Sequence, residues 1–206
     1  MTLKEAQGRH AGAQATREKL LEAAEQVFAD KGFYDAAVDE IVARSGTSKG
    51  SVYFHFPSKE SLFLAVMEQM GRHLAQRVER EVAKESDAVR RLDAALETTV
   101  ETLRRHKSLA KLLLVKGYSM GPAFAEKRQQ VFFSFAEMTE GLIAEAMRAK
   151  GAAPGVDARV ASYAWIGAVS EVVVRWLECG EPDPLDALPT LRLMVRRGIG
   201  VEGQGA

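Results

Sequence analysis

The chain has 206 residues, of which 47% are apolar, and its 28 Lys and Arg residues balance its 28 Asp and Glu residues. A chain of this length can bury one large core or two smaller ones. The charge balance excludes a protein that coats nucleic acid indiscriminately, so any affinity for DNA must come from a local patch. The single cysteine, Cys179, excludes an intrachain disulfide, and we expect it to be a buried, unreactive thiol.

The sequence shows no segment that is typical of a membrane or secreted protein. No apolar run approaches about 18 residues, and the first residues contain no apolar stretch of the kind found in secretion signals. We therefore expect a cytoplasmic protein that does not interact with a membrane.

Residues 1–15 are small and polar, with several cations, a single acid and no helical periodicity. We predict a flexible basic arm, which either enters a DNA minor groove or is a solvated tail. Thr16 is the predicted N-cap of a helix that ends at Lys31 and Gly32. The apolar stripe of this helix packs against the two short helices that follow. The stripe consists of Leu20, Leu21, Ala24, Val27 and Phe28.

Residues 38–63 have the spacing of a helix-turn-helix. Gly46 can take the positive φ that a tight turn needs, and Ser48 is a plausible N-cap for the second helix. Between Ile41 and Lys59 the segment contains several cations and no acid, a surface that suits phosphate oxygens and base edges. The apolar positions that would hold the two helices together are Val38, Ile41, Val42 and Val52. Phe33 and Phe56 are expected in the same core.

The run Gly-Thr-Ser-Lys-Gly-Ser-Val-Tyr-Phe-His-Phe-Pro-Ser-Lys-Glu-Ser-Leu-Phe, residues 46–63, resembles the signature of the TetR family of transcriptional regulators. The resemblance implies that residues 48–55 form a recognition helix, with Lys49 and Ser51 nearest the bases. Ala36 and Ala37 stand where hydroxyls often touch the DNA backbone in that family, so we expect fewer phosphate contacts there. The residues expected at DNA are Arg44, Thr47, Ser48, Lys49, Gly50, Ser51, Tyr53, Phe54, His55 and Lys59.

After Pro57 the sequence predicts a long helix from Ser58 to about Ala83, followed by further helices to Arg197. We predict an all-α fold with an N-terminal three-helix helix-turn-helix domain over residues 16–65. Residues 66–200 would form a helical bundle for ligand binding and dimerisation, and 201–206 a tail. The last helix contains Pro189, where we expect a kink.

Aromatic residues are concentrated between residues 122 and 150, where they form either plain core or the wall of an apolar cavity. Residues 112–128 look similar to TetR members that govern fatty-acid degradation and sense acyl-coenzyme A. This similarity implies an apolar, acyl-CoA-like effector, and drug-like apolar compounds are the alternative effector class. The phosphates of an acyl-CoA could meet Arg104, Lys107, Lys111 or Lys116. The predicted cavity residues are Leu103, Leu113, Tyr118, Met120, Phe124, Phe132, Phe135, Met138 and Tyr163.

Residues 157–178 carry two apolar stripes, one including Val160, Ala164 and Ala168, the other including Tyr163 and Val173. A helix that is apolar on two sides must be covered on both, and a second copy of the chain is the simplest cover. A two-fold dimer would set its recognition helices about 34 to 36 Å apart and would read an inverted repeat. We therefore predict a homodimeric repressor that binds double-stranded DNA and is released from it when the effector binds.

Two other functions are considered, an enzyme built in a helical bundle and a module that binds protein through its helix-turn-helix. The sequence contains no paired Glu-x-x-His, no His-Glu-x-x-His, no phosphate-binding loop and no cysteine cluster. We therefore predict no catalytic residue, no metal and no cofactor. The interaction module remains open, because only the salt dependence of DNA binding would separate it.

Overall fold

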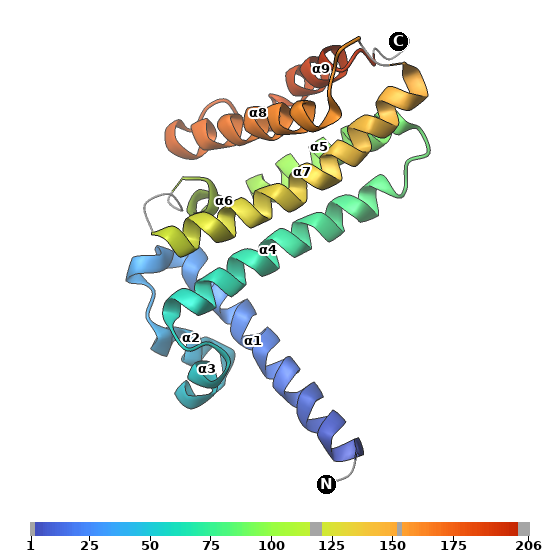
Figure 1. The fold of residues 1–206 in the computed structure, drawn as a ribbon. Helices are drawn as coiled ribbons and strands as arrows, with labels where there is room; N and C mark the ends of the chain where they lie inside the picture. The colour runs from blue at the N-terminus through green and yellow to red at the C-terminus, as the bar shows by residue number, and fades with distance from the viewer. Residues whose placement is uncertain (1–2, 116–120, 152–153, 202–206) are drawn as a thin grey trace. The chain divides into compact units, whose positions relative to one another are not determined.

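The structure is a computed structural model that describes residues 3–115, 121–151 and 154–201. The described residues contain helices and no strand, which confirms the all-α prediction (Figure 1). The chain divides into two compact units, Met1–Gln69 and Met70–Ala206, and the division falls within a long helix. The helices are α1 (Leu3–Asp35), α2 (Val38–Ser45), α3 (Lys49–His55), α4 (Lys59–Val82), α5 (Ala88–Arg105), α6 (Lys107–Leu114), α7 (Pro122–Lys150), α8 (Ala158–Cys179) and α9 (Leu188–Gly198).

The first unit has an aromatic core between α1 and the start of α4. The rings of Phe28 and Phe63 meet edge to face with centroids 5.0 Å apart, and the ring of Phe33 lies 5.2 Å from that of Phe63. Phe33 and Phe56 are both buried, as predicted. Ile41 of α2 and Val52 of α3 are buried in the same unit, so the core of this unit also holds these two short helices.

Helix α1 differs from the prediction at its start. It begins at Leu3, so residues 3–15 are helical where a flexible arm was predicted. The predicted N-cap, Thr16, was wrong, because its hydroxyl donates to the Gly12 carbonyl 2.9 Å away inside the helix. Ala, Gln, Glu and Lys in this stretch favour a helix without any apolar stripe. The predicted end was better placed, because Gly32 has a φ of 81° and interrupts the helix there.

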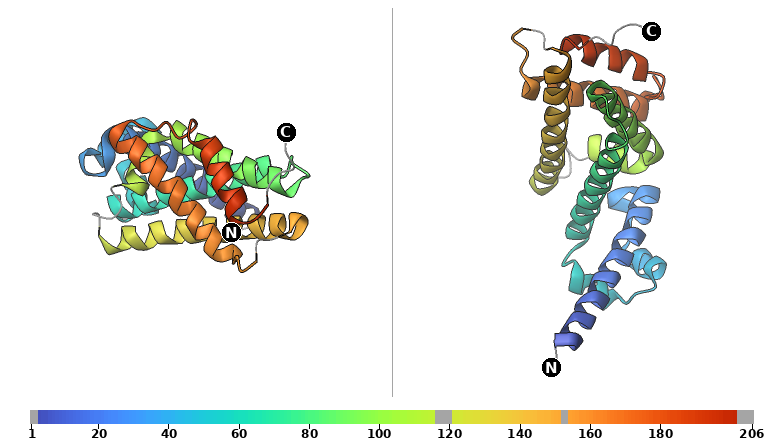
Figure 2. Two further views of the ribbon diagram at one scale, coloured as in Figure 1. Left: turned by 90° about the horizontal axis from the view of Figure 1, so that it is seen from above. Right: turned by 90° about the vertical axis from the view of Figure 1, so that its right-hand side faces the viewer.

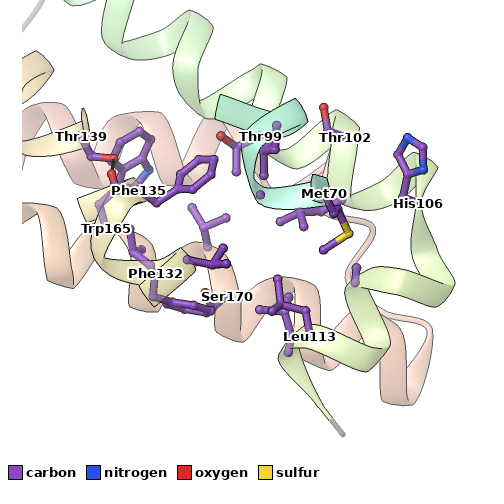
Figure 3. A pocket seen from close by; sticks show the side chains of 18 residues that line it. Met70, Thr99, Thr102, His106, Leu113, Phe132, Phe135, Thr139, Trp165 and Ser170 are labelled. Atoms are coloured by element: carbon purple, nitrogen blue, oxygen red, sulfur yellow. Dashed lines mark hydrogen bonds between the residues drawn. The ribbon is translucent and has the colours of Figure 1, made fainter. Parts of the chain in front are cut away.

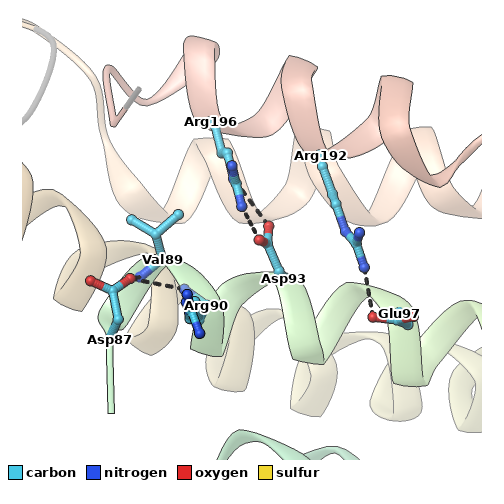
Figure 4. A network of polar contacts seen from close by, with 7 residues as sticks. All are labelled: Asp87, Val89, Arg90, Asp93, Glu97, Arg192 and Arg196. Atoms are coloured by element: carbon cyan, nitrogen blue, oxygen red, sulfur yellow. Dashed lines mark hydrogen bonds and ion pairs between the residues drawn. The ribbon is translucent and has the colours of Figure 1, made fainter. Parts of the chain in front are cut away.

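In the second unit, α5 packs against α7 and α9, and α7 packs against α8 (Figure 2). Ion pairs hold α9 on α5: Arg192 meets Glu97 at 2.6 Å, and Arg196 forms a double hydrogen bond with Asp93 (Figure 4). On the side that faces α7, Arg91 meets Glu145 at 2.5 Å. Helix α5 is therefore fixed to the elements on both sides of it.

Within the single chain helix α8 buries one stripe, which consists of Ser162, Trp165, Val169, Val173 and Leu177. Val160 and Tyr163 are exposed, by 65% and 42%. By length and composition α8 could also cross a membrane, although 28% of its apolar window is buried inside the fold. A helix that is covered on one face by its own chain and on another by a partner has the same apolar composition as a helix that crosses a membrane.

Two smaller expectations were wrong. Cys179 is exposed, because it is the last residue of α8 and precedes the Gly180 cap. Pro189 lies in the first turn of α9 instead of kinking a longer helix. Proline is favoured in a first turn because the N–H it lacks has no helical acceptor there.

Candidate nucleic-acid interface and ligand cavity

The turn between α2 and α3 has the geometry of a helix-turn-helix. Gly46 has a φ of 66° and donates its N–H to the Val42 carbonyl at 3.1 Å, which closes α2. The Ser48 hydroxyl accepts the Ser51 N–H at 3.1 Å, so the predicted N-cap of α3 is confirmed. Val52 is buried and marks the inner face of α3. The exposed residues of this helix form its outer face.

That outer face contains most of the residues predicted to contact DNA. Phe54 is 80% exposed and Tyr53 is 46% exposed, while Lys49 and Gly50 are also exposed. Ser51 and His55 are partly buried, and the ring of His55 contacts that of Phe54. Thr47 is turned toward α2, where its hydroxyl shares a 2.8 Å hydrogen bond with the Ser45 hydroxyl. Thr47 therefore supports the turn.

Acids from outside the cationic segment pair with two of its cations. The Lys49 ammonium lies 2.7 Å from the Asp39 carboxylate, and this hydrogen bond raises the pKa of Lys49 above its ordinary value. The Arg44 guanidinium lies 3.3 Å from the Asp30 carboxylate. Both pairs are solvent-exposed, so each contributes little to stability and can be exchanged for a phosphate.

Replacing Asp39 with asparagine is expected to raise the affinity of this face for any duplex DNA about two- to fivefold. The change frees Lys49 and removes a negative charge from the surface that would meet phosphates. Gel-shift titrations at one fixed salt concentration measure the effect. Glu22→Gln, the same charge change on the exposed part of α1, is the control and should leave affinity unchanged. Equal affinity for Asp39→Asn and the unchanged chain would contradict this role of Asp39.

Lys59, one of the residues expected at DNA, is bound within the first unit. Its ammonium donates to the carbonyls of Tyr34 and Ala36 at 3.1 and 3.0 Å, and it lies over the ring of Phe33. It therefore connects the start of α4 to the segment between α1 and α2. An ammonium has three donors, so a third hydrogen bond to a phosphate is compatible with this position.

The second unit contains an apolar cavity of about 80 Å³ (Figure 3). Ligand sites in proteins are commonly about 300 to 1,000 Å³, so a larger ligand must displace some of the lining side chains. Gly71 lets α4 approach α7, because a Cβ there would lie 3.1 Å from Val131. The lining residues are Met70, Gly71, Leu74, Thr99, Thr102, Leu103, His106, Ala110, Leu113, Leu114, Val131, Phe132, Phe135, Thr139, Trp165, Ile166, Val169 and Ser170.

Four predicted cavity residues line it: Leu103, Leu113, Phe132 and Phe135. Phe124, Met138 and Tyr163 are not among its described lining residues. Phe124 is buried, and Tyr163 is exposed on α8 and lines the adjoining groove instead. Tyr118 and Met120 lie outside the described residues.

An open groove of about 490 Å³ between α7 and α8 adjoins the cavity. The two share Leu114, Phe132, Ile166 and Ser170 as lining residues, and the groove also has the charged residues Arg128 and Glu171 in its lining. Arg128 lines the groove, with its guanidinium 5.0 Å from the centroid of the Phe132 ring.

Three of the cations predicted to meet ligand phosphates, Arg104, Lys107 and Lys111, line neither the cavity nor the groove. Arg104 pairs with Asp183 at 3.0 Å, and the Lys107 ammonium lies over the Trp176 ring. Lys111 is exposed and lines neither the cavity nor the groove, and Lys116 lies outside the described residues. Arg128, which lines the adjoining groove, is a cation that the prediction had omitted.

Residues 20–66, which contain the turn and its exposed helix, match the model of a family described as bacterial regulatory proteins, tetR family. The chain carries the N-terminal domain of the TetR family of transcriptional regulators. This confirms the resemblance that residues 46–63 suggested.

Similar proteins extend the comparison beyond the TetR domain. The chain is 35% identical over 109 residues to the transcriptional activator FasR of Mycolicibacterium smegmatis, covering 53% of this chain and 50% of that protein. It is 20% identical over 159 residues to the fatty acid metabolism regulator protein of Bacillus subtilis, covering 77% and 82%. The solved structure of FadR from Bacillus subtilis in complex with stearoyl-CoA has the same fold. Its TM-score is 0.75 at 20% identity, and the match covers 88% of this chain and 98% of that one.

Sequence reasoning recovered the TetR signature but missed much of the cavity wall. The predicted cavity residues did not include Met70 and Leu74 of α4 or Trp165 of α8, which all line the cavity. Because α4, α5, α7 and α8 all contribute, only their packing shows which residues share the cavity. One signal was available: Gly71 interrupts the apolar periodicity of α4 where α7 comes close.

Proposed function

We propose that this TetR-type regulator is a homodimeric repressor that binds an inverted-repeat operator through α3 and is released by an effector in the cavity. The observation that carries the proposal is the outer face of α3, where Lys49, Tyr53 and Phe54 are exposed on a helix capped by Ser48. Donors and planar rings on a protruding helix suit phosphates and base edges. Because its partner is chromosomal DNA, the protein acts in the cytoplasm of a bacterium.

An exposed apolar surface on α8 and α9 supports the homodimer. Val160 and Met194 are 65% and 59% exposed, and Leu193 is 49% exposed. A groove of about 450 Å³ between the two helices is lined by Ala161, Ala164 and other small or apolar residues. Contiguous apolar surface of this kind marks an association site. The occupant we propose is the same helix pair of a second copy, which would form an isologous four-helix interface.

The proposed effector is an apolar or long-chain compound of the acyl-CoA type. Its apolar part would enter the cavity between α5, α7 and α8, and its polar part would lie in the adjoining groove beside Arg128. The relatives named for fatty-acid metabolism and the stearoyl-CoA complex of FadR support this class. The effector must bind the DNA-incompetent state more tightly, and operator DNA must then weaken effector binding by the same factor.

The test measures binding to a selected operator duplex as salt is raised, with and without stearoyl-CoA. A repressor loses affinity steeply with salt, because lysine and arginine contacts release counterions from the duplex. Stearoyl-CoA should lower operator affinity further at each salt concentration. Binding that ignores salt would favour a protein-interaction module, and equal affinities with and without the thioester would remove the proposed effector.

Replacing Arg128 with glutamine is expected to weaken the binding of stearoyl-CoA about tenfold, because a charge-assisted hydrogen bond to an anionic group is lost. The apolar part of the ligand is unaffected, so stearyl alcohol should bind both proteins equally. Arg148→Gln, at an exposed position near the other end of α7, serves as control. Isothermal titration measures all three proteins, and an equal loss in the Arg148 variant would argue against a specific role for Arg128.

A further inference from the structure

The indole of Trp165 lies in the wall of the cavity with its N–H unused. The side chain is 6% exposed, and Nε1 has no hydrogen-bond partner among the described residues. Figure 3 shows the indole nitrogen on the ring edge that faces Phe135, between that ring and Thr139. Buried donors are nearly always paired, because an unmade bond leaves the cost of removing the donor from water uncompensated. An orphaned donor at a cavity wall indicates an acceptor that the ligand supplies.

Three of the hydroxyls that line the cavity cannot offer the same donor, and the fourth, on Ser170, also lines the adjoining groove. Thr99, Thr102 and Thr139 each donate to a carbonyl one helical turn earlier, at 2.7 Å. A hydroxyl has one proton, so each can only accept a hydrogen bond from a ligand. The indole N–H of Trp165 is therefore a donor that a ligand acceptor at this end of the cavity can use.

The lining also indicates the charge of that acceptor. No Lys, Arg, Asp or Glu is among the described lining residues, and the titratable residue His106 lies at the end opposite Trp165 (Figure 3). A carboxylate or phosphate beside Trp165 would be buried without a counter-charge, which is very unfavourable. A neutral oxygen avoids that cost.

We propose that the effector carries a neutral hydrogen-bond acceptor, a ketone, ester, thioester, amide or ether oxygen, that binds the N–H of Trp165. Its apolar body would lie against Leu103, Val131 and Phe135. This inference rests on the proposed function, which makes the cavity the effector site. It narrows the effector class, because a ligand that is pure hydrocarbon at this end leaves the N–H unpaired.

The test uses two probes of the same shape, para-fluoroacetophenone and para-fluoro-α-methylstyrene, which differ by C=O against C=CH₂. Fluorine NMR titrations of the full chain give both dissociation constants and their ratio. Replacing Trp165 with phenylalanine keeps an aromatic ring and removes the N–H. We expect the preference for the ketone over the alkene to fall about tenfold in Trp165→Phe, because one buried hydrogen bond is lost.

Trp176→Phe is the matched control, since Trp176 is the other tryptophan and does not line the cavity. Its preference ratio should equal that of the unchanged chain. An unchanged ratio in Trp165→Phe, or no binding of either probe by the unchanged chain, would overturn the proposal.

A second measurement covers the case in which Trp165→Phe does not fold. In the nitrogen-15 spectrum of the unchanged chain, the Trp165 indole N–H should move downfield with the ketone and not with the alkene. Equal movement with both probes would overturn the proposal. Operator binding is measured separately without either probe, so loss of the proposed regulator function would be recognised independently of the result at Trp165.

Discussion

Replacing Ala164 with arginine is expected to convert the dimer into monomers and to lower operator affinity about 100-fold or more. Ala164 is exposed and lines the groove between α8 and α9, so the substitution leaves the fold of one chain intact. In the proposed interface two arginines would be buried near each other, and Asp157, an acid that lines the groove, already accepts the Val160 N–H at the start of α8. A monomer holds one half-site and loses the gain from binding two linked sites.

Sedimentation velocity measures the association state, and a gel shift with a two-half-site operator measures the affinity. Ser134→Arg adds the same charge to an exposed position on α7 and should remain dimeric. A dimeric Ala164→Arg protein with full operator affinity would show that α8 and α9 are not the interface.

Replacing Ser51 with glutamate is expected to abolish operator binding while preserving or raising the stability of the first unit. Ser51 is the third residue of α3, three residues after its N-cap Ser48. A glutamate there completes a capping box, and its charge is favourable near a helix N-terminus. The same charge lies on the face that would meet phosphates, so affinity for every duplex should fall about 100-fold.

The neutral variant Ser51→Gln separates charge from shape, because glutamine also completes a capping box. It should retain most of the non-specific affinity that the glutamate variant loses. Thermal unfolding followed by circular dichroism checks stability. If the glutamate variant bound DNA as well as the glutamine variant, the outer face of α3 would not be the DNA-binding surface.

The sequence predicted the helix-turn-helix well because its determinants are local. Gly46 needs a positive φ, Ser48 caps the next helix, and Val52 must be buried, and each of these lies within a few residues of the next. The same locality explains the error at Thr16. The residues next to Thr16 are compatible with a helix. Residues 3–15 have no apolar stripe, so the periodicity that indicates most helices is absent there.

The cavity and the charge pairs were harder to predict because they depend on packing between elements. Asp39 and Lys49 are ten positions apart, and only the turn brings α2 and α3 close enough for their 2.7 Å contact. Trp165 lies on the buried stripe of α8. The sequence of α8 has apolar residues on two sides, so it does not show which side its own chain covers. Periodicity shows that a residue is covered, and it does not show by which neighbour.

The most direct test of the account is a selection of duplexes from random DNA by the purified chain, followed by sequencing. We expect one enriched inverted repeat whose half-site centres lie about 34 to 36 Å apart, because two α3 helices of a two-fold dimer must fit one face of the duplex. Failure to enrich any sequence at low salt, or enrichment of a single half-site without symmetry, would contradict it.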